Sequence, residues 1–286
     1  VFTAQKQAGA MIGSGYTTWQ VWAHELGHIL GFVDLYYKAT YNQKFDATHD
    51  YLNSWSLMDA QPPASHVDAW HKRKIRWIPP AAIAEVQPPV NGMPETHRYE
   101  LLPLEWKTTE YPGMGKPGNP ARQLLRIKLS DHHWIHVENR QPAPVASQNL
   151  PDDTLGLSPP DASGQAGGVL VTDTADPFSE VLYRSPVTAL NPHGGGVPAD
   201  SVTVQSRGMH AGDTLDLNTT YPAYDGIRVR VVQSIPNPMA GKPEAFAVEI
   251  DRWPGKFLDL EIRPWHAPVE YATHDIWIDW PGNGTE

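Results

Sequence analysis

Residues 24–34 read HELGHILGFVD, and this stretch tells more about function than the rest of the chain. His24 and His28 have i and i+4 spacing, so on a helix their Cβ atoms lie about 6 Å apart on one side. Both imidazoles can then reach a single Zn²⁺ ion at about 2.0–2.1 Å. Glu25, about 100° round the helix from His24, can address a metal-bound water as general base. The stretch therefore predicts a zinc hydrolase site with Glu25 as its catalytic residue.

A turn after the helix is predicted to supply the third metal ligand. Gly31 can end the helix in a left-handed conformation, and a sharp turn there brings Asp34 back toward the two histidines. The alternative third ligand is His49, which lies between Asp46 and Asp50. We favour Asp34, because it needs only the turn at Gly31 to reach the metal.

The predicted helix, within residues 17–32, has an apolar stripe opposite its histidines. Trp22, Leu26, Ile29 and Leu30 follow the i, i+4, i+7, i+8 spacing of one helix face. This pattern predicts that the stripe is anchored in a core, while the histidine side opens on a cleft.

The composition indicates a folded chain with many turns. The 286 residues are 40% hydrophobic and include 11 Trp, enough for a real core, while 23 Gly and 28 Pro favour turns and short strands. A formal net charge of −10 argues against nucleic acid as a partner, because phosphate binding needs clustered Lys and Arg. The basic run at residues 71–76 ends a predicted helix at about 65–77, where cations complement the helix dipole. No apolar run reaches the roughly 18 residues of a membrane span, and the absence of cysteine leaves the compartment open.

The chain divides into four parts in an expected α+β fold. Residues 1–80 hold the two predicted helices, and the Pro-rich residues 81–122 are expected to be a linker or covering loop with one short strand near 98–102. Residues 123–256 are expected to form an antiparallel β-sandwich-like module, and residues 257–286 C-terminal strands or the start of a further domain. The predicted strands cover residues 123–129, 134–138, 169–172, 202–205, 227–232, 245–250, 258–262 and 276–278.

The pattern HExxHxxGxxD resembles that of the metzincin zinc endopeptidases, whose second hallmark is a methionine-containing turn beneath the metal. SWSLMD at residues 54–59 lies about two dozen residues after Asp34, where such a turn is expected. With SHVDAWHKRKIRWI at residues 65–78, the run most resembles the immune inhibitor A-like metallopeptidases, which are secreted bacterial enzymes with related members elsewhere.

This resemblance implies a role for each matching position. His24 and His28 match the helical zinc ligands, Asp34 the third ligand, Glu25 the catalytic base and Met58 the turn methionine. Many metzincins have histidine at the third ligand position, and some have a tyrosine shortly after the methionine, which this chain lacks.

The resemblance also implies a cellular setting and partners. It implies the lower half of a metzincin-like catalytic domain in a secreted or cell-surface zinc endopeptidase that acts on protein or peptide substrates. The family has an upper subdomain before the active-site helix, so an upstream segment of the same precursor or another chain is expected to supply that half. The alternative is a non-catalytic surface or assembly protein that retains a metal-stabilised peptidase core.

Two groups of acidic residues are weaker candidates for Ca²⁺ sites. Asp213, Asp216 and Asn218, or Asp152 and Asp153, offer the oxygen ligands that Ca²⁺ prefers. Ordinary turn chemistry explains these residues equally well, and we favour it.

A second histidine-rich segment lies in the strand predicted at residues 134–138. The density of His132, His133, His136 and Glu138 suggests a second metal site. On a strand, however, His132, Trp134, His136 and Glu138 share one face and His133 points away. We favour a structural strand with solvated imidazoles.

Overall fold

The computed structural model describes residues 19–35, 55–58, 66–106, 108–130, 133–141, 167–175, 187–190, 208–217, 226–238, 243–254, 259–262 and 276–279. This part of the chain is mostly β structure, with two mixed sheets and few helices. The helices are α1 (Trp19–Ile29), α2 (Ala69–Lys74) and the short 3-10 helices η2 (Pro80–Ala82) and η3 (Thr108–Glu110).

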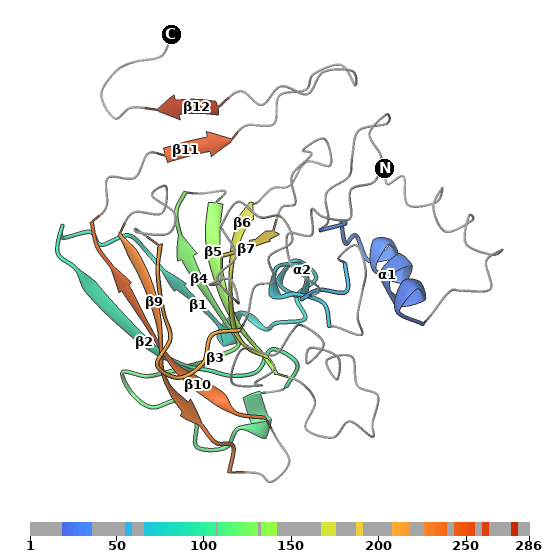
Figure 1. Cartoon of the computed structure of the whole chain (residues 1–286), viewed down its shortest axis with the longest axis horizontal. Helices are drawn as coiled ribbons and strands as arrows, with labels where there is room; N and C mark the ends of the chain where they lie inside the picture. Colours follow the sequence, from blue (N-terminus) through green and yellow to red (C-terminus); the bar gives the residue numbers. More distant parts are fainter. Residues whose placement is uncertain are drawn as a thin grey trace.

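Ten strands form two sheets of five strands each in the described ranges (Figure 1). The first sheet has the order β1 (Ile83–Val86), β4 (Leu124–Lys128), β5 (His133–Arg140), β6 (Gly168–Ala175) and β7 (Val187–Ala189). The second has the order β3 (Ala121–Arg122), β2 (Glu95–Leu101), β10 (Ala245–Arg252), β9 (Ile227–Ile235) and β8 (Thr214–Asp216). A separate antiparallel pair joins β11 (Asp259–Ile262) and β12 (Ile276–Asp279).

Alternation of apolar and polar residues predicts most of these strands, but not β1, β3, β7 or β8. In β9, Ile227, Val229 and Val231 are buried while Arg228 and Arg230 are only half-buried, which is the expected pattern for a strand with one face in a core. The strand predictions are confirmed except for residues 202–205, which lie outside the described residues. Residues 81–122, expected to be a linker or covering loop, contribute β1 to the first sheet and β2 and β3 to the second.

Within residues 123–256 every described strand pairing is antiparallel, as expected, and the sheets are mixed because strands from residues 81–122 add parallel pairings. Strand β1 runs parallel to β4, and β3 runs parallel to β2, whereas the other pairings are antiparallel. The chain leaves the first sheet after β1, forms β2 in the second sheet and returns at β4. Strands separated by such a crossover can run parallel, whereas strands joined by a tight hairpin cannot.

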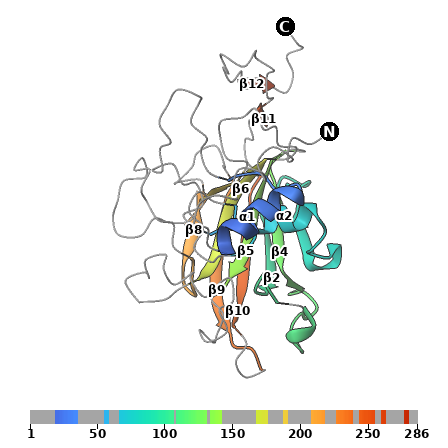
Figure 2. The same cartoon turned by 90° about the vertical axis from the view of Figure 1, so that its right-hand side faces the viewer.

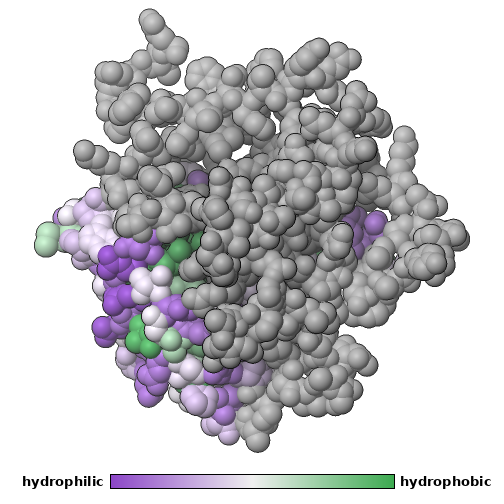
Figure 3. All heavy atoms as spheres, in the orientation of Figure 1, coloured by the Kyte–Doolittle hydropathy of each residue, from purple (hydrophilic) through white to green (hydrophobic). Residues whose placement is uncertain are grey.

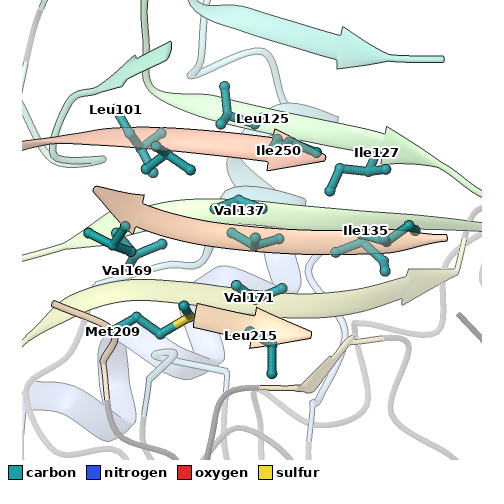
Figure 4. Packing of buried hydrophobic residues seen from close by; sticks show 14 of the residues in the cluster. Leu101, Leu125, Ile127, Ile135, Val137, Val169, Val171, Met209, Leu215 and Ile250 are labelled. Atoms are coloured by element: carbon teal, nitrogen blue, oxygen red, sulfur yellow. The ribbon is translucent and has the colours of Figure 1, made fainter. Parts of the chain in front are cut away.

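The two sheets pack face to face over one hydrophobic core (Figure 4). Leu125, Ile135 and Val137 of the first sheet meet Leu101 and Ile250 of the second, and all five are fully buried. A shared core of this size fixes the first sheet as a rigid base for the segments packed on its other face.

Helices α1 and α2 lie on the side of the first sheet that faces away from the second (Figures 1 and 2). Helix α2 lies against the first sheet and α1 lies beyond it. The Ala69 backbone N–H donates a 2.8 Å hydrogen bond to Glu138 of β5. Trp55 and Met58 share a buried cluster with Leu170 of β6. The N-terminal segments and the first sheet are therefore packed together.

The predicted orientation of α1 is wrong. Trp22, Leu26, Ile29 and Leu30 are 45% to 64% exposed, whereas His24 on the opposite side is buried. The histidine face packs inward because Gly27, which has no side chain, lets the helix approach Met58 closely. An apolar stripe favours burial, but its spacing does not determine which neighbour covers it.

The outward face of the second sheet is covered by charged groups. Arg230 pairs with Glu249 at 2.8 Å and with Asp251 at 3.0 Å. Seen from the side shown in Figure 3, the described surface is mainly hydrophilic, with small hydrophobic patches. No helix within the described ranges is long and apolar enough to cross a membrane.

Candidate metal centre

The site begins with the way in which α1 ends. Gly31 has a φ of 87°, its N–H donates to the His28 carbonyl at 3.0 Å, and the Phe32 N–H donates to the Gly27 carbonyl at 3.0 Å. These two bonds form a Schellman motif, with Gly31 in the left-handed conformation that glycine adopts without strain. The predicted stop at Gly31 is confirmed, and it reverses the chain so that Asp34 faces the helix.

His24, His28 and Asp34 lie together at this turn. Asp34 Oδ1 lies 2.9 Å from His24 Nε2 and 3.3 Å from His28 Nε2. One ligand atom from each residue lies within 4.8 Å of the others, and the two rings meet edge to face with centroids 5.0 Å apart. Tetrahedral bonds of about 2.0–2.1 Å to Zn²⁺ require ligand atoms about 3.3 Å apart, which is close to the spacing observed.

Backbone carbonyls determine which ring nitrogen of each histidine faces Asp34. His24 Nδ1 donates to the Leu57 carbonyl at 2.8 Å, and His28 Nδ1 donates to the Phe32 carbonyl at 2.9 Å. A neutral imidazole with its proton on Nδ1 carries a lone pair on Nε2. Two such lone pairs directed at a carboxylate repel it unless a proton or a cation lies between them. The donor set and its orientation therefore fit a divalent metal ion.

The electrostatics of the site favour a positive charge at the same point. The hydrogen bond with Asp34 raises the pKa of His28 above its ordinary value, against burial, which lowers it. The carboxylate of Glu25 also raises the pKa of His28, so this half-buried side chain lies within electrostatic reach of the ring. A metal ion would replace the proton and satisfy the same negative charge.

Met58 lies directly beneath α1. It is fully buried in the cluster that contains Phe32, Trp55 and Trp70. A Cβ atom at Gly27 would lie 2.8 Å from Met58 Sδ and 2.9 Å from a ring carbon of Phe32, so only glycine fits this position of the helix without displacing them. The sequence signal for this contact is a glycine in the middle of an amphipathic helix.

The other predicted metal-site candidates have different outcomes. His49 and the aspartates beside it lie outside the described residues. In the described ranges, no other three histidine, aspartate or glutamate side chains converge closely enough to hold a metal ion. His136 is fully buried, so the prediction of a solvated imidazole is wrong, and burial lowers its pKa well below the ordinary value.

The calcium candidates that the structure describes have other partners. Asp213 accepts a hydrogen bond from the His210 N–H at 2.9 Å, which is turn chemistry, and Asp216 pairs with Arg228 at 3.0 Å. Asn218, Asp152 and Asp153 lie outside the described residues.

Three buried polar residues next to the centre were not predicted as functional from the sequence, namely Ser56, Asp68 and His71. Asp68 caps the N-terminus of α2 by accepting the His71 N–H at 3.1 Å. An aspartate followed by a histidine at i+3 within the run at residues 65–78 is the local signal that could have identified the cap.

Comparisons of the chain with protein-family models, with curated proteins and with solved structures give no match. Function is therefore inferred from the residues of the site and their geometry.

Proposed function

We propose that the chain is a zinc-dependent endopeptidase in which α1 and the turn at residues 55–58 form the lower half of a metzincin-like catalytic domain. The observation that carries the proposal is the convergence of two imidazole Nε2 atoms on one carboxylate oxygen of Asp34. The use of both Nδ1 N–H groups by backbone carbonyls supports it, because zinc-binding histidines are normally oriented in this way.

His24, His28 and Asp34 would hold the zinc ion, and a bound Zn²⁺ polarises the scissile carbonyl and lowers the pKa of its water to about 7. The Glu25 carboxylate accepts the proton of the attacking water and passes it to the leaving amine. The Leu57 and Phe32 carbonyls keep the two imidazole rings in place during this transfer. With zinc bound, the Asp34 carboxylate would reduce the formal charge of the centre to about +1. Other zinc peptidases also use two histidines and a carboxylate as ligands.

The substrate and setting follow from the same proposal. We propose protein or peptide substrates and a secreted or cell-surface location, as the resemblance to immune inhibitor A-like metallopeptidases implies. The exposed apolar side chains of α1 support a further segment against this helix, either from upstream in the same precursor or from another chain.

Replacement of the proposed base tests this function. Glu25→Gln should bind zinc with the stoichiometry of the wild type, while its rate of hydrolysis of a fluorescently labelled unfolded protein should fall by a factor on the order of 10² to 10⁴. Glu95→Gln, which changes a partly exposed carboxylate on β2, is the matched control and should leave both quantities unchanged.

Two results would contradict the proposal. Normal hydrolysis by Glu25→Gln would show that Glu25 is not the base. Stoichiometric zinc binding by a wild-type chain that hydrolyses no protein or peptide would instead favour the alternative, a non-catalytic surface or assembly protein with a metal-stabilised core.

A further inference from the structure

One buried carboxylate is connected to every ligand of the candidate metal centre. Asp68 Oδ2 accepts hydrogen bonds from Ser56 Oγ at 2.7 Å and from His71 Nδ1 at 2.8 Å. Asp68, Ser56 and His71 are all at most 2% exposed. We propose that Asp68 is a positioning residue that sets the geometry of the metal centre through Ser56 on one side and His71 on the other.

The branch through Ser56 leads to His24. Ser56 Oγ donates to Asp68 and accepts the Met58 N–H at 3.2 Å, which holds the turn on both sides of Leu57. The Leu57 carbonyl accepts the Nδ1 proton of His24. Asp68 therefore fixes the carbonyl that orients the first imidazole.

The branch through His71 leads to the other two ligands. His71 Nε2 accepts the Val33 N–H at 3.1 Å, and Val33 is the residue between Phe32 and Asp34. The Phe32 carbonyl orients His28. A single hydrogen bond to the loop thus holds both the carbonyl behind His28 and the backbone of Asp34.

The direction of every bond in this network is determined. His71 Nε2 accepts from the Val33 backbone N–H, so His71 Nδ1 carries a proton directed at Asp68. The two oxygens of Asp68 receive three donors, which are Ser56 Oγ–H, His71 Nδ1–H and the His71 backbone N–H. Asparagine at position 68 would replace one accepting oxygen with an NH₂ group, which would then face the N–H or O–H of a partner that also donates. If the His71 proton moved from Nδ1 to Nε2 to relieve this conflict, Nε2–H would face the Val33 N–H, which also donates.

The network is also anchored to the β-sandwich. Glu138 of β5 accepts the Ala69 N–H, directly after Asp68, and Arg140 donates to the His66 carbonyl at 3.2 Å. The His66 carbonyl in turn accepts the Leu57 N–H at 3.1 Å. The first sheet therefore holds the carboxylate, and the carboxylate holds the two loops of the metal centre.

The test compares Asp68→Asn and Ser56→Ala with the wild type. We expect each variant to bind Zn²⁺ on the order of 10- to 100-fold more weakly, as for other residues that orient metal ligands. Cobalt substitution gives a second readout, because the visible absorption bands of bound Co²⁺ report ligand geometry. These bands should shift in both variants, and less in Ser56→Ala, which removes only one branch.

The control is Val248→Ala, in the core between the two sheets. It should lower the free energy of unfolding of the metal-free chain, as any large-to-small core change does, without changing the Co²⁺ spectrum or the Zn²⁺ affinity. A positioning role for Asp68 is thus separated from a general loss of stability. If Asp68→Asn fails to fold, the Zn²⁺ affinity and Co²⁺ spectrum of Ser56→Ala alone test the proposal.

This inference rests on the proposed metal site, and its failure is distinguishable from the failure of that site. Wild-type affinity and an unchanged Co²⁺ spectrum in both variants would overturn the role of Asp68 and leave the zinc peptidase intact. A wild-type chain that binds neither Zn²⁺ nor Co²⁺ would overturn both.

Discussion

At the scale of single residues, the candidate centre depends on a glycine that reverses the chain. Gly31 has a φ of 87°, and a Cβ atom there would meet nothing within 4 Å, so the only obstacle to a side chain is the backbone conformation itself. The turn determines where Asp34 lies relative to the two histidines.

Substitution at Gly31 should therefore act through backbone strain. Gly31→Ala should lower the free energy of unfolding by about 1 kcal/mol and weaken Zn²⁺ binding, because an alanine in the left-handed region is strained. Gly31→Asn should lose less unfolding free energy and less Zn²⁺ affinity, since asparagine tolerates this conformation. Urea unfolding and zinc titration measure the two effects, and equal values for the two variants would contradict this account.

At the scale of elements, α1 faces the site with its polar side. Gly27 contacts Met58 and Phe32, while Leu26, one residue before it, is more than half exposed. The helix is therefore held by a close contact at a glycine rather than by its apolar stripe.

This arrangement predicts opposite responses at two adjacent positions. Alanine at position 27 improves helix propensity by about 1 kcal/mol but forces an overpacked contact that typically costs 1–3 kcal/mol, so Gly27→Ala should be destabilised and bind Zn²⁺ more weakly. Leu26→Ala should change the free energy of unfolding by less than about 0.5 kcal/mol. Urea unfolding curves of both variants measure these free energies. A large loss of unfolding free energy in Leu26→Ala would mean that the apolar stripe is covered.

Helix α2 shows what could be predicted for an element and what could not. A helix within residues 65–77 and its basic end follow from local pattern, but α2 covers only Ala69–Lys74, ending in Lys72, Arg73 and Lys74. The burial of Lys72 and its 3.5 Å pair with Glu105 depend on a segment distant in sequence, which local periodicity does not encode.

At the scale of the whole molecule, the segments of the candidate metal centre are joined to the sandwich through a buried carboxyl group. Burial raises the pKa of Glu138 to about 8, although Arg140 lowers it. Its ordinary pKa in an unfolded chain is 4.5. The folded state therefore favours the protonated form of Glu138. The stability that this protonated group contributes is fully present below pH 4.5 and is lost as the pH rises through 8.

Removal of this titration should change the pH dependence of unfolding. Glu138→Gln can still accept the Ala69 N–H, so its free energy of unfolding relative to the wild type should rise between pH 5 and pH 9, both measured in urea with a chelator present. Other groups titrate equally in the two proteins, so the difference isolates Glu138. A difference that stays constant with pH would show that the buried carboxyl group is ionised throughout.

Several features depend only on residues that are near neighbours in the chain, so they could be predicted from the sequence. The i and i+4 spacing of His24 and His28, the stop at Gly31 and the alternation in β9 follow from hydrogen bonds and steric limits that act within a few residues. Three features appear only in the folded chain: the buried face of α1, the parallel pairing of β1 with β4, and the links from Asp68 to the loops of the candidate metal centre. These features join segments far apart in the chain, and their energies come from packing and buried polar contacts that exist only once the first sheet and α2 are in place.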